Sequence, residues 1–388
     1  MIQELKPITA APDAAELANR LARVREKMAE ENLDYYVAFD PVNVFYLTNF
    51  YNYVHERPFI LVIGKEDTPR FVVPKLEIPH VQSRIKCELE LVEYFEYPAP
   101  AGENWYDYYA PLFREDATVG VEPAMTLEIY NKTPGKKTVT DIIDEVRFIK
   151  SEFEIGRYVH ACDVLKTGFK KLVEIIKPGS MLFELYGAVS QEMMARAVLE
   201  IPEVNPLITR VVAMAQPPSI SHDPHNFTNL FQQMEEGGPH VTIIAGQVDG
   251  CGVELERTFF LGAVPDAAKK PFEVMMEARA LAYDQLKPGA NMSEIDKLVN
   301  DLFKNAGYKE NLLHRTGHGM GITGHEGPFL AEGYDRELEA GMMISGEPGI
   351  YFPGLGGFRH SDTVLITTDG YANLTEAPDS LEALTIKL

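Results

Sequence analysis

The chain has 388 residues, of which 45% are hydrophobic and 24% charged, the composition of a folded globular protein large enough for two domains. Acidic residues outnumber basic ones 58 to 36, and the formal charge of −22 repels phosphate backbones and anionic lipids, so we expect neither nucleic acid nor a membrane as a partner. No stretch approaches the roughly 20 apolar residues of a membrane span, and the N-terminus lacks the pattern of a secretion signal. The three cysteines have neither disulfide nor zinc spacing, which favours the cytoplasm: Cys87, Cys162 and Cys251.

The first part of the chain alternates helix and strand patterns. Apolar residues spaced four, three and four apart predict an amphipathic helix within residues 13–32: Leu17, Leu21, Val24 and Met28. Short apolar runs between Pro, Asn, Gly and charged residues predict strands at 33–39, 44–47, 59–63 and 71–73. Strand-like segments at 92–98 and 117–122 and a helix around Trp105–Phe113 complete a predicted α/β domain over residues 1–147.

The second part, residues 148–388, contains an internal duplication. A long helix pattern ends at Pro178–Gly179, and the same Lys-Pro-Gly sequence recurs 110 residues later, at 177–179 and 287–289. In both copies a second helix pattern follows, starting near Glu184 or Glu294, and apolar strand-like sequence comes after it. Two αα–ββ halves that face each other predict a cleft between them.

Four clusters of titratable residues in the second part contain six of the ten histidines. They lie at residues 221–226, 254–258, 314–328 and 346–362. In the second cluster, Glu254 and Glu256 are two residues apart and face the same side of a predicted strand. This pairing is unfavourable unless a cation, a proton or a substrate lies between the carboxylates, or unless the strand is a solvated edge.

Three more residues of these clusters have both a chemical and a structural interpretation. Glu347 lies within apolar strand sequence, where a carboxylate is either functional or part of a buried salt bridge. His318 lies between two glycines, which admit a ligand or simply form a turn. His225 follows a proline, and a neutral imidazole near two carboxylates can move protons near pH 7.

Six motifs at and around these clusters resemble, in order, those of the pita-bread family, which includes methionine aminopeptidase, aminopeptidase P, prolidase, creatinase and ectoine hydrolase. They are FDPVNVFYLTNF (39–50), VRFIKSEFEI (146–155), ERTFFLG (256–262), GHGMGITGHEGP (317–328), ISGEPGIY (344–351) and FRHSDTVLITTDG (358–370). The resemblance implies an α/β (α+β) protein with a creatinase-like N-terminal domain at 1–147. A C-terminal pita-bread catalytic domain with a pseudo-twofold duplication follows at 148–388.

Peptidases of this family hold two metal ions with Asp, Asp, His, Glu and Glu, and this chain departs from that set. His318 and Glu347 match the His and first Glu positions, and Glu254 takes the place of the second Asp. The first Asp position holds Ile243, and the last Glu position holds Ser361. Because a pair of divalent ions needs several bridging carboxylates, we expect no dinuclear metal centre and no cofactor.

Creatinase, a relative without metal, resembles this chain at the residues that differ from the peptidases. Its Leu-Glu-Arg-Thr motif places a glutamate at Glu256, and its catalytic His-Asn, Gly-His and Glu-Pro match His225, His318 and Glu347. We therefore expect these four residues to be catalytic, with His225 moving a proton and Glu256 holding or attacking the substrate. By the same resemblance and by their place in the clusters, the expected substrate-binding residues are Arg57, which reaches across a homodimer, Glu254, His325, Arg359 and His360.

The resulting prediction is a metal-independent hydrolase of a non-peptide C–N bond in a small amidine or guanidino compound, because two glutamates can hold a planar delocalised cation. One alternative is an Xaa-Pro metallopeptidase with a degenerate, single-metal site at Glu254, His318 and Glu347. The other is a non-catalytic pita-bread binding module, although such a module has no need of a carboxylate in an apolar strand.

Overall fold

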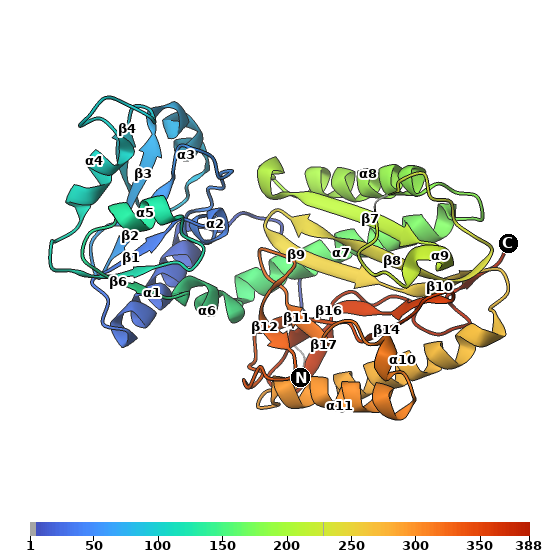
Figure 1. The fold of residues 1–388 in the computed structure, drawn as a ribbon. Coiled ribbons are helices and arrows are strands. Elements are labelled where there is room, and N and C mark those ends of the chain that lie inside the picture. Colours follow the sequence, from blue (N-terminus) through green and yellow to red (C-terminus); the bar gives the residue numbers. More distant parts are fainter. Residues whose placement is uncertain (1–4, 228) are drawn as a thin grey trace. The chain divides into compact units, whose positions relative to one another are not determined.

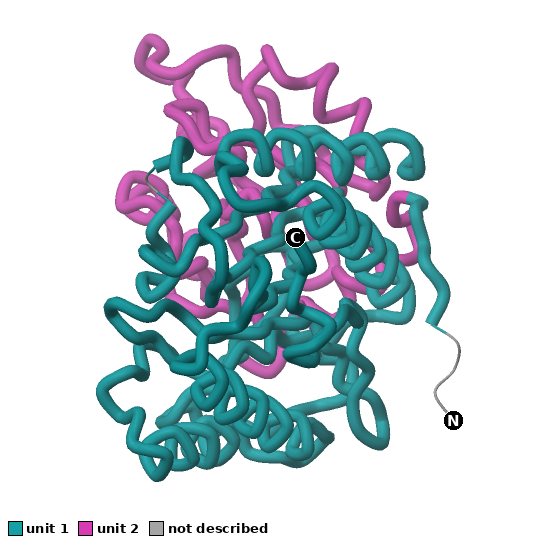
Figure 2. The backbone as a smooth tube through the Cα atoms, turned by 90° about the vertical axis from the view of Figure 1, so that its right-hand side faces the viewer, with its two compact units in different colours: residues 1–10, 148–388 teal, residues 11–147 magenta. Residues whose placement is uncertain are grey.

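The structure is a computed structural model that describes residues 5–227 and 229–388. The chain divides into two compact units, coloured separately in Figure 2. One unit is Ala11–Arg147, and the other is Phe148–Leu388 together with the first residues of the chain, of which 5–10 are described. Each unit has its own sheet and its own core.

The unit Ala11–Arg147 is built on a six-stranded mixed sheet in the order β4-β3-β2-β1-β5-β6 (Figure 1). The strands are β1 (Tyr35–Ala38), β2 (Ile60–Gly64), β3 (Arg70–Pro74), β4 (Glu90–Tyr94), β5 (Thr118–Val121) and β6 (Lys136–Val139). The helices are α1 (Ala14–Glu30), α2 (Pro41–Thr48), α3 (Ile78–Arg84), α4 (Trp105–Tyr109), α5 (Leu127–Lys132) and α6 (Ile142–Phe148). Helix α1 buries the face predicted from its apolar spacing, including Leu17, Val24 and Met28.

The strand predicted at 44–47 is wrong, because these residues lie in helix α2. The side chain of Asp40 accepts a hydrogen bond from the Val42 backbone N–H, and Pro41 occupies the first helical turn, two signals for a helix start. All eight residues of α2 are buried, so the helix shows no amphipathic period in the sequence. Its apolar run therefore resembles a buried strand.

The second unit contains two helix pairs, as the duplication predicts. The first pair is α7 (Glu152–Ile175) and α8 (Leu182–Glu200), and the second is α10 (Asp266–Asp284) and α11 (Met292–Asn305). In each copy the glycine of Lys-Pro-Gly, Gly179 or Gly289, has a φ of +84°, the left-handed region that favours glycine. The repeated motif is thus a repeated turn between paired helices.

The sheet of this unit joins strands from both halves in the order β12-β11-β13-β16-β9-β8-β10-β18, with β7 beside β8 and β17 beside β16. The first half supplies β7 (Arg210–Gln216), β8 (Gly237–Val248), β9 (Cys251–Glu256) and β10 (Thr258–Leu261). The second half supplies β11 (Gly317–Gly319), β12 (Glu326–Leu330), β13 (Met343–Gly346), β16 (Ser361–Ile366), β17 (Tyr371–Asn373) and β18 (Thr385–Ile386). In the same half, β14 (Gly349–Phe352) and β15 (Gly356–Arg359) form a separate two-stranded hairpin.

The two halves meet where β9 pairs with β16, with Glu256 opposite Ser361 and Leu255 opposite Asp362. Helices α7 and α8 pack against the first half of the sheet, whereas α10 and α11 pack against the strands of the second half (Figure 1). A single apolar cluster runs through both halves. Among the described residues, no helix is both long enough and apolar enough to span a membrane.

Candidate active site

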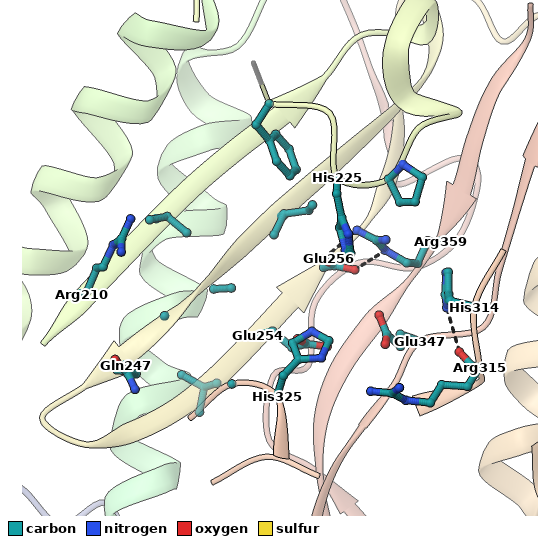
Figure 3. Close-up of a pocket in the computed structure, with 18 of the residues that line it drawn as sticks. Arg210, His225, Gln247, Glu254, Glu256, His314, Arg315, His325, Glu347 and Arg359 are labelled. Atoms are coloured by element: carbon teal, nitrogen blue, oxygen red, sulfur yellow. Dashed lines mark hydrogen bonds and ion pairs between the residues drawn. The ribbon is translucent and has the colours of Figure 1, made fainter. Parts of the chain in front are cut away.

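A cavity of about 720 Å³ opens within the second unit, over the strands where its two halves meet (Figure 3). Its volume lies within the range of small-molecule sites. Six of the residues expected at the site from the sequence line this cavity: His225, Glu254, Glu256, His325, Glu347 and Arg359. Strands β8 and β9 contribute one wall, and the segments around β11 and β13–β15 contribute the other.

Glu254 lies near the end of β9, and its carboxylate is buried. The hydroxyls of Ser345 and Ser361 both donate short hydrogen bonds to its Oε1 atom. The other oxygen, Oε2, faces His318 at 3.7 Å from Nε2. Burial raises the pKa of the Glu254 carboxyl, whereas the charge of His318 opposes that shift.

His318 on β11 is fully buried and lies between two carboxylates. Its Nδ1 lies 3.1 Å from the Gly319 carbonyl, and its Nε2 lies 3.3 Å from Oε1 of Glu347 without an aligned hydrogen-bond partner. Burial lowers the pKa of His318, but the negative charges of Glu254 and Glu347 outweigh it and raise the pKa to about 9. Burial alone would raise the pKa of Glu347, but the close contact with His318 and the charges of His314 and His318 outweigh it and lower the pKa to about 2.

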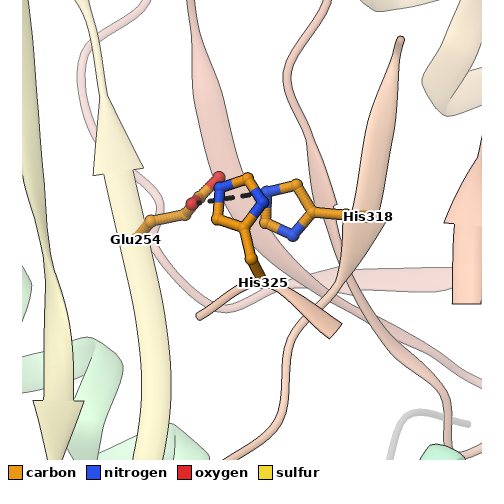
Figure 4. Close-up of side chains that lie close together, drawn as sticks. All are labelled: Glu254, His318 and His325. Carbon is orange, nitrogen blue, oxygen red and sulfur yellow. Dashed lines mark ion pairs between the residues drawn. The ribbon is translucent and has the colours of Figure 1, made fainter. Parts of the chain in front are cut away.

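His325 stacks on His318, with ring centroids 3.7 Å apart and ring planes 23° apart. Burial and the charge of His318 lower the pKa of His325 to about 4, so its imidazole is neutral at pH 7. Ligand atoms of Glu254, His318 and His325 all lie within 4.8 Å of one another (Figure 4). One carboxylate and two imidazoles therefore converge on a single point at the cavity wall.

Glu256 and Arg359 form a buried two-point ion pair across the cavity wall. Arg359 Nε lies 2.5 Å from Oε2 of Glu256, and Nη2 donates to Oε1 at 3.0 Å. Burial raises the pKa of Glu256 and the guanidinium opposes that shift, while the Glu256 charge raises the pKa of Arg359. A chain of hydrogen bonds continues from Arg359 to the Tyr351 hydroxyl at 3.1 Å and from there to Nε2 of His314 at 2.7 Å.

The two-metal ligand set of the family does not fit this site. Ile243 lines the cavity at the first Asp position and has no atom that can bind a metal ion. Ser361, at the last Glu position, uses its hydroxyl to donate to Glu254. The remaining carboxylate of the wall, Glu256, is already bound to Arg359.

Two residues expected to bind substrate lie outside the cavity lining. Arg57 is in the other unit, where its guanidinium pairs with Glu96 at 2.5 Å, and its predicted reach across a homodimer stays a prediction. His360 is fully buried and lies against Phe272 of α10, with ring centroids 5.5 Å apart. It lies between β15 and β16 and does not line the cavity, so its position gives no support to a role in substrate binding.

Sequence reasoning missed Ser345, Tyr351 and His314 as parts of the site. Ser345 orients Glu254, and the other two residues connect to Arg359 through hydrogen bonds. His314 lies in a cluster that the sequence singled out, and Tyr351 ends the motif that contains Glu347. Their positions within these motifs were the only indication in the sequence that they belong to the site. Such positions do not show which side chains contact one another in the fold.

A pita-bread fold with a cavity lined by carboxylates and histidines is the arrangement of a hydrolase class, and comparisons with known proteins agree. Residues 157–368 match Metallopeptidase family M24, and residues 20–149 match the Creatinase/Prolidase N-terminal domain. The chain therefore belongs to metallopeptidase family M24. This membership confirms the predicted fold and supports a hydrolase.

Similar proteins cover the chain over nearly its whole length. The Xaa-Pro dipeptidase of Pyrococcus furiosus is 26% identical over 375 residues, which cover 94% of this chain and 100% of that protein. The solved structure of prolidase from Pyrococcus furiosus has a TM-score of 0.76 at 25% identity, covering 91% of this chain and 99% of that one. Dipeptidase PepE from Mycobacterium ulcerans has a TM-score of 0.83 at 23% identity, covering 97% of this chain and 100% of that one.

These findings contradict the predicted hydrolysis of a non-peptide C–N bond. Relatives of this chain are named Xaa-Pro dipeptidase, probable dipeptidase and prolidase, so the assignment to a metal-free branch near creatinase and ectoine hydrolase is not supported. The geometry supplies a physical reason, because Glu256 was expected to hold a guanidinium group of the substrate. An internal guanidinium, that of Arg359, already binds both of its oxygens.

Proposed function

We propose that the chain is a peptidase that hydrolyses short peptides, with Xaa-Pro dipeptides as the first substrates to test. The observation that carries the proposal is the convergence of Glu254, His318, His325 and Glu347 at one cavity of an M24 fold. The similarity to proteins named Xaa-Pro dipeptidase and prolidase supports a dipeptide as the substrate. A cavity of about 720 Å³ has room for a dipeptide and several waters.

In this proposal Glu347 accepts the proton of the attacking water. Its carboxylate is ionised at neutral pH, as a proton acceptor must be, because neighbouring positive charges lower its pKa. Because Glu347 is buried, its surroundings have a lower dielectric constant than water, which strengthens each charge-assisted hydrogen bond to the reacting groups. His225 lines the same cavity, and we assign to it the donation of a proton to the leaving amide nitrogen.

Arg315 is our candidate for binding the carboxylate of the substrate. Its guanidinium lies over the Phe329 ring at 4.6 Å from the centroid, and its Nε donates to the Gly317 carbonyl at 3.1 Å. These contacts hold the side chain at the cavity wall (Figure 3). Within residues 5–227 and 229–388 its terminal N–H groups donate to no other protein group, so they can bind a ligand. Arg359 does not fill this role because Glu256 engages it.

The proposal is tested by incubating the purified protein with Xaa-Pro dipeptides, dipeptides without proline, creatine and ectoine. We expect release of free amino acids from at least one dipeptide and no turnover of creatine or ectoine. Glu347→Gln is expected to abolish this release. Absence of any peptide hydrolysis, with divalent cations supplied, would contradict the proposal and favour a binding module.

A further inference from the structure

Glu254, His318 and His325 bring three possible metal-binding atoms together at the cavity wall. One ligand atom each of Glu254, His318 and His325 lies within 4.8 Å of the other two, and Oε2 of Glu254 is 3.7 Å from Nε2 of His318 (Figure 4). His318 is fully buried, and its Nε2 lies 3.3 Å from Oε1 of Glu347 and 3.7 Å from Oε2 of Glu254 without an aligned hydrogen bond to either. A buried nitrogen without an aligned hydrogen bond is costly unless a ligand occupies the space that it faces.

These three donors match the ligand set of a single catalytic metal ion. Two histidines and one glutamate, with a fourth position left for water, are sufficient to bind one zinc-like cation. The Gly319 carbonyl accepts from Nδ1 of His318, which leaves Nε2 as the metal-binding nitrogen. The serine hydroxyls on Oε1 of Glu254 likewise orient its other oxygen toward the site.

The site offers a second ion neither further ligands nor further negative charge. Ile243 cannot bind a cation, and Ser361 donates its hydroxyl to Glu254. Once His318 is neutral, as a metal-binding imidazole must be, the carboxylates of Glu254, Glu256 and Glu347 and the guanidinium of Arg359 together carry a formal charge of −2. One divalent cation neutralises this charge, whereas two would leave an excess of +2 in a buried site, which is unfavourable.

We propose that this site binds one divalent cation through Glu254, His318 and His325, and that the Arg359 guanidinium held by Glu256 supplies the positive charge that a second ion provides elsewhere in the family. When bound, the ion supplies a Lewis acid and an activated water. The proposal concerns cation binding and does not depend on the identity of the substrate.

The number of ions is tested on the full chain after chelator treatment and dialysis. Isothermal titration calorimetry with Zn²⁺ and with Mn²⁺ is expected to show one ion per chain, and the Mn²⁺ protein is expected to give the six-line electron paramagnetic resonance spectrum of an isolated ion. Two tightly bound ions, a spin-coupled Mn²⁺ pair, or no binding would each overturn the proposal.

The ligand assignment is tested with His325→Ala, because His325 is exposed at the cavity mouth and its removal leaves the core intact. We expect at least about tenfold weaker Zn²⁺ binding, in line with the loss of one of three ligands. His80→Ala, a partly exposed histidine of the other unit, is the matched control and should bind as the unaltered protein does. Equal affinity in His325→Ala would overturn the assignment.

The role of Arg359 is tested with two variants that change the charge of the site in opposite directions. Glu256→Gln leaves the buried guanidinium unbalanced and is expected to weaken Mn²⁺ binding several-fold. Arg359→Gln removes the fixed positive charge and is expected to strengthen it several-fold. Circular dichroism confirms that the compared variants are folded. Affinities that change in the same direction, or not at all, would overturn the role given to Arg359.

Discussion

Arg257 and Asp362 form an ion pair in which neither side chain is exposed, with Nη2 of the arginine 2.8 Å from Oδ1 of the aspartate. The other oxygen of Asp362 accepts from Nη2 of Arg279 at 2.6 Å. Arg257 also donates to the backbone carbonyls of Glu256 and Ser361, the residues that face each other where the two halves of the sheet meet. One aspartate therefore balances two arginines directly behind the cavity.

We expect Asp362→Asn to destabilise the protein by about 3–5 kcal/mol, because a neutral amide leaves the buried guanidinium of Arg257 without a counter-charge and Arg279 with only the half-exposed Asp379. The measurement is the free energy of unfolding in urea. Asp379→Asn is the matched control, since Asp379 also contacts Arg279 but has a half-exposed side chain. The control is expected to lose less than about 1 kcal/mol. Equal losses in both variants would contradict this account.

Gly252 on β9 is expected to tolerate no side chain. A Cβ atom there would lie 2.6 Å from the Gly321 carbonyl oxygen and 2.7 Å from that of Thr323, in the loop that precedes His325. The Gly252 N–H also donates to the Gly321 carbonyl at 2.7 Å. We expect Gly252→Ala to displace this loop, lowering the melting temperature and Zn²⁺ affinity together.

A second glycine supplies the control for that substitution. Gly187 lies in helix α8, and no neighbouring atom lies within 4 Å of the position that an alanine methyl group would take, so Gly187→Ala has the space it needs. Alanine is the better helix former, and we expect about 0.5–1 kcal/mol of added stability with unchanged Zn²⁺ binding. Similar melting curves for the two variants would show that the loop accommodates a methyl group at Gly252.

Glu347→Gln is expected to reduce kcat for dipeptide hydrolysis by at least about a hundredfold and to change KM little, because the amide keeps the shape of the side chain but does not accept the proton of water. Steady-state kinetics on one Xaa-Pro dipeptide separates the two constants. The control is Glu326→Gln, at the start of β12, where the carboxylate accepts a hydrogen bond from the Thr323 hydroxyl. A large increase in KM with unchanged kcat would instead indicate that Glu347 only binds substrate.

His240 is expected to make the protein less stable as the pH falls from 6.5 to 4. Burial lowers the pKa of its folded state to about 4, whereas the unfolded chain binds a proton near pH 6.5. Between these values the unfolded state binds more protons, so stability decreases with falling pH by about 3 kcal/mol from this group alone.

His240→Phe tests this expectation, since the imidazole stacks on Phe259 at 5.0 Å and a phenyl ring can occupy a similar position. Urea unfolding at several pH values should show a smaller loss of stability toward pH 4 in the variant than in the unaltered protein. His80→Ala, which removes a partly exposed histidine, should show the same loss of stability toward pH 4 as the unaltered protein. Identical pH profiles for His240→Phe and the unaltered protein would assign the acid sensitivity to other groups.

The repeated architecture was predictable from sequence because its signals are local. The two Lys-Pro-Gly turns require a glycine at positive φ, and Gly179 and Gly289 show the same value. The wrong strand at 44–47 shows the limit of that approach. Full burial of α2 removes the period that distinguishes a helix from a strand, and the capping residue Asp40 was then the better signal.

The residues of the site were predictable, but their partners were not. The motifs indicated Glu256 and Arg359 separately. Their ion pair forms only because the fold brings together two strands whose paired residues are 103 positions apart in the chain. The stacking of His325 on His318 likewise depends on how the intervening loop turns back. The sequence does not show whether a glutamate is already paired with an arginine of the same chain. The predicted binding of a substrate cation by Glu256 therefore could not be checked before the fold was known.

The two serine hydroxyls on Glu254 also bear on which ions the protein selects. Since Ser345 and Ser361 both donate to Oε1, only Oε2 remains to bind a cation, and the carboxylate would coordinate it through a single oxygen. Calcium favours six to eight oxygen ligands, often with a two-oxygen carboxylate, and magnesium favours an octahedron of oxygens. A single oxygen beside two imidazoles instead suits zinc, cobalt or nickel. We therefore expect the protein to discriminate against the abundant alkaline-earth ions of its surroundings.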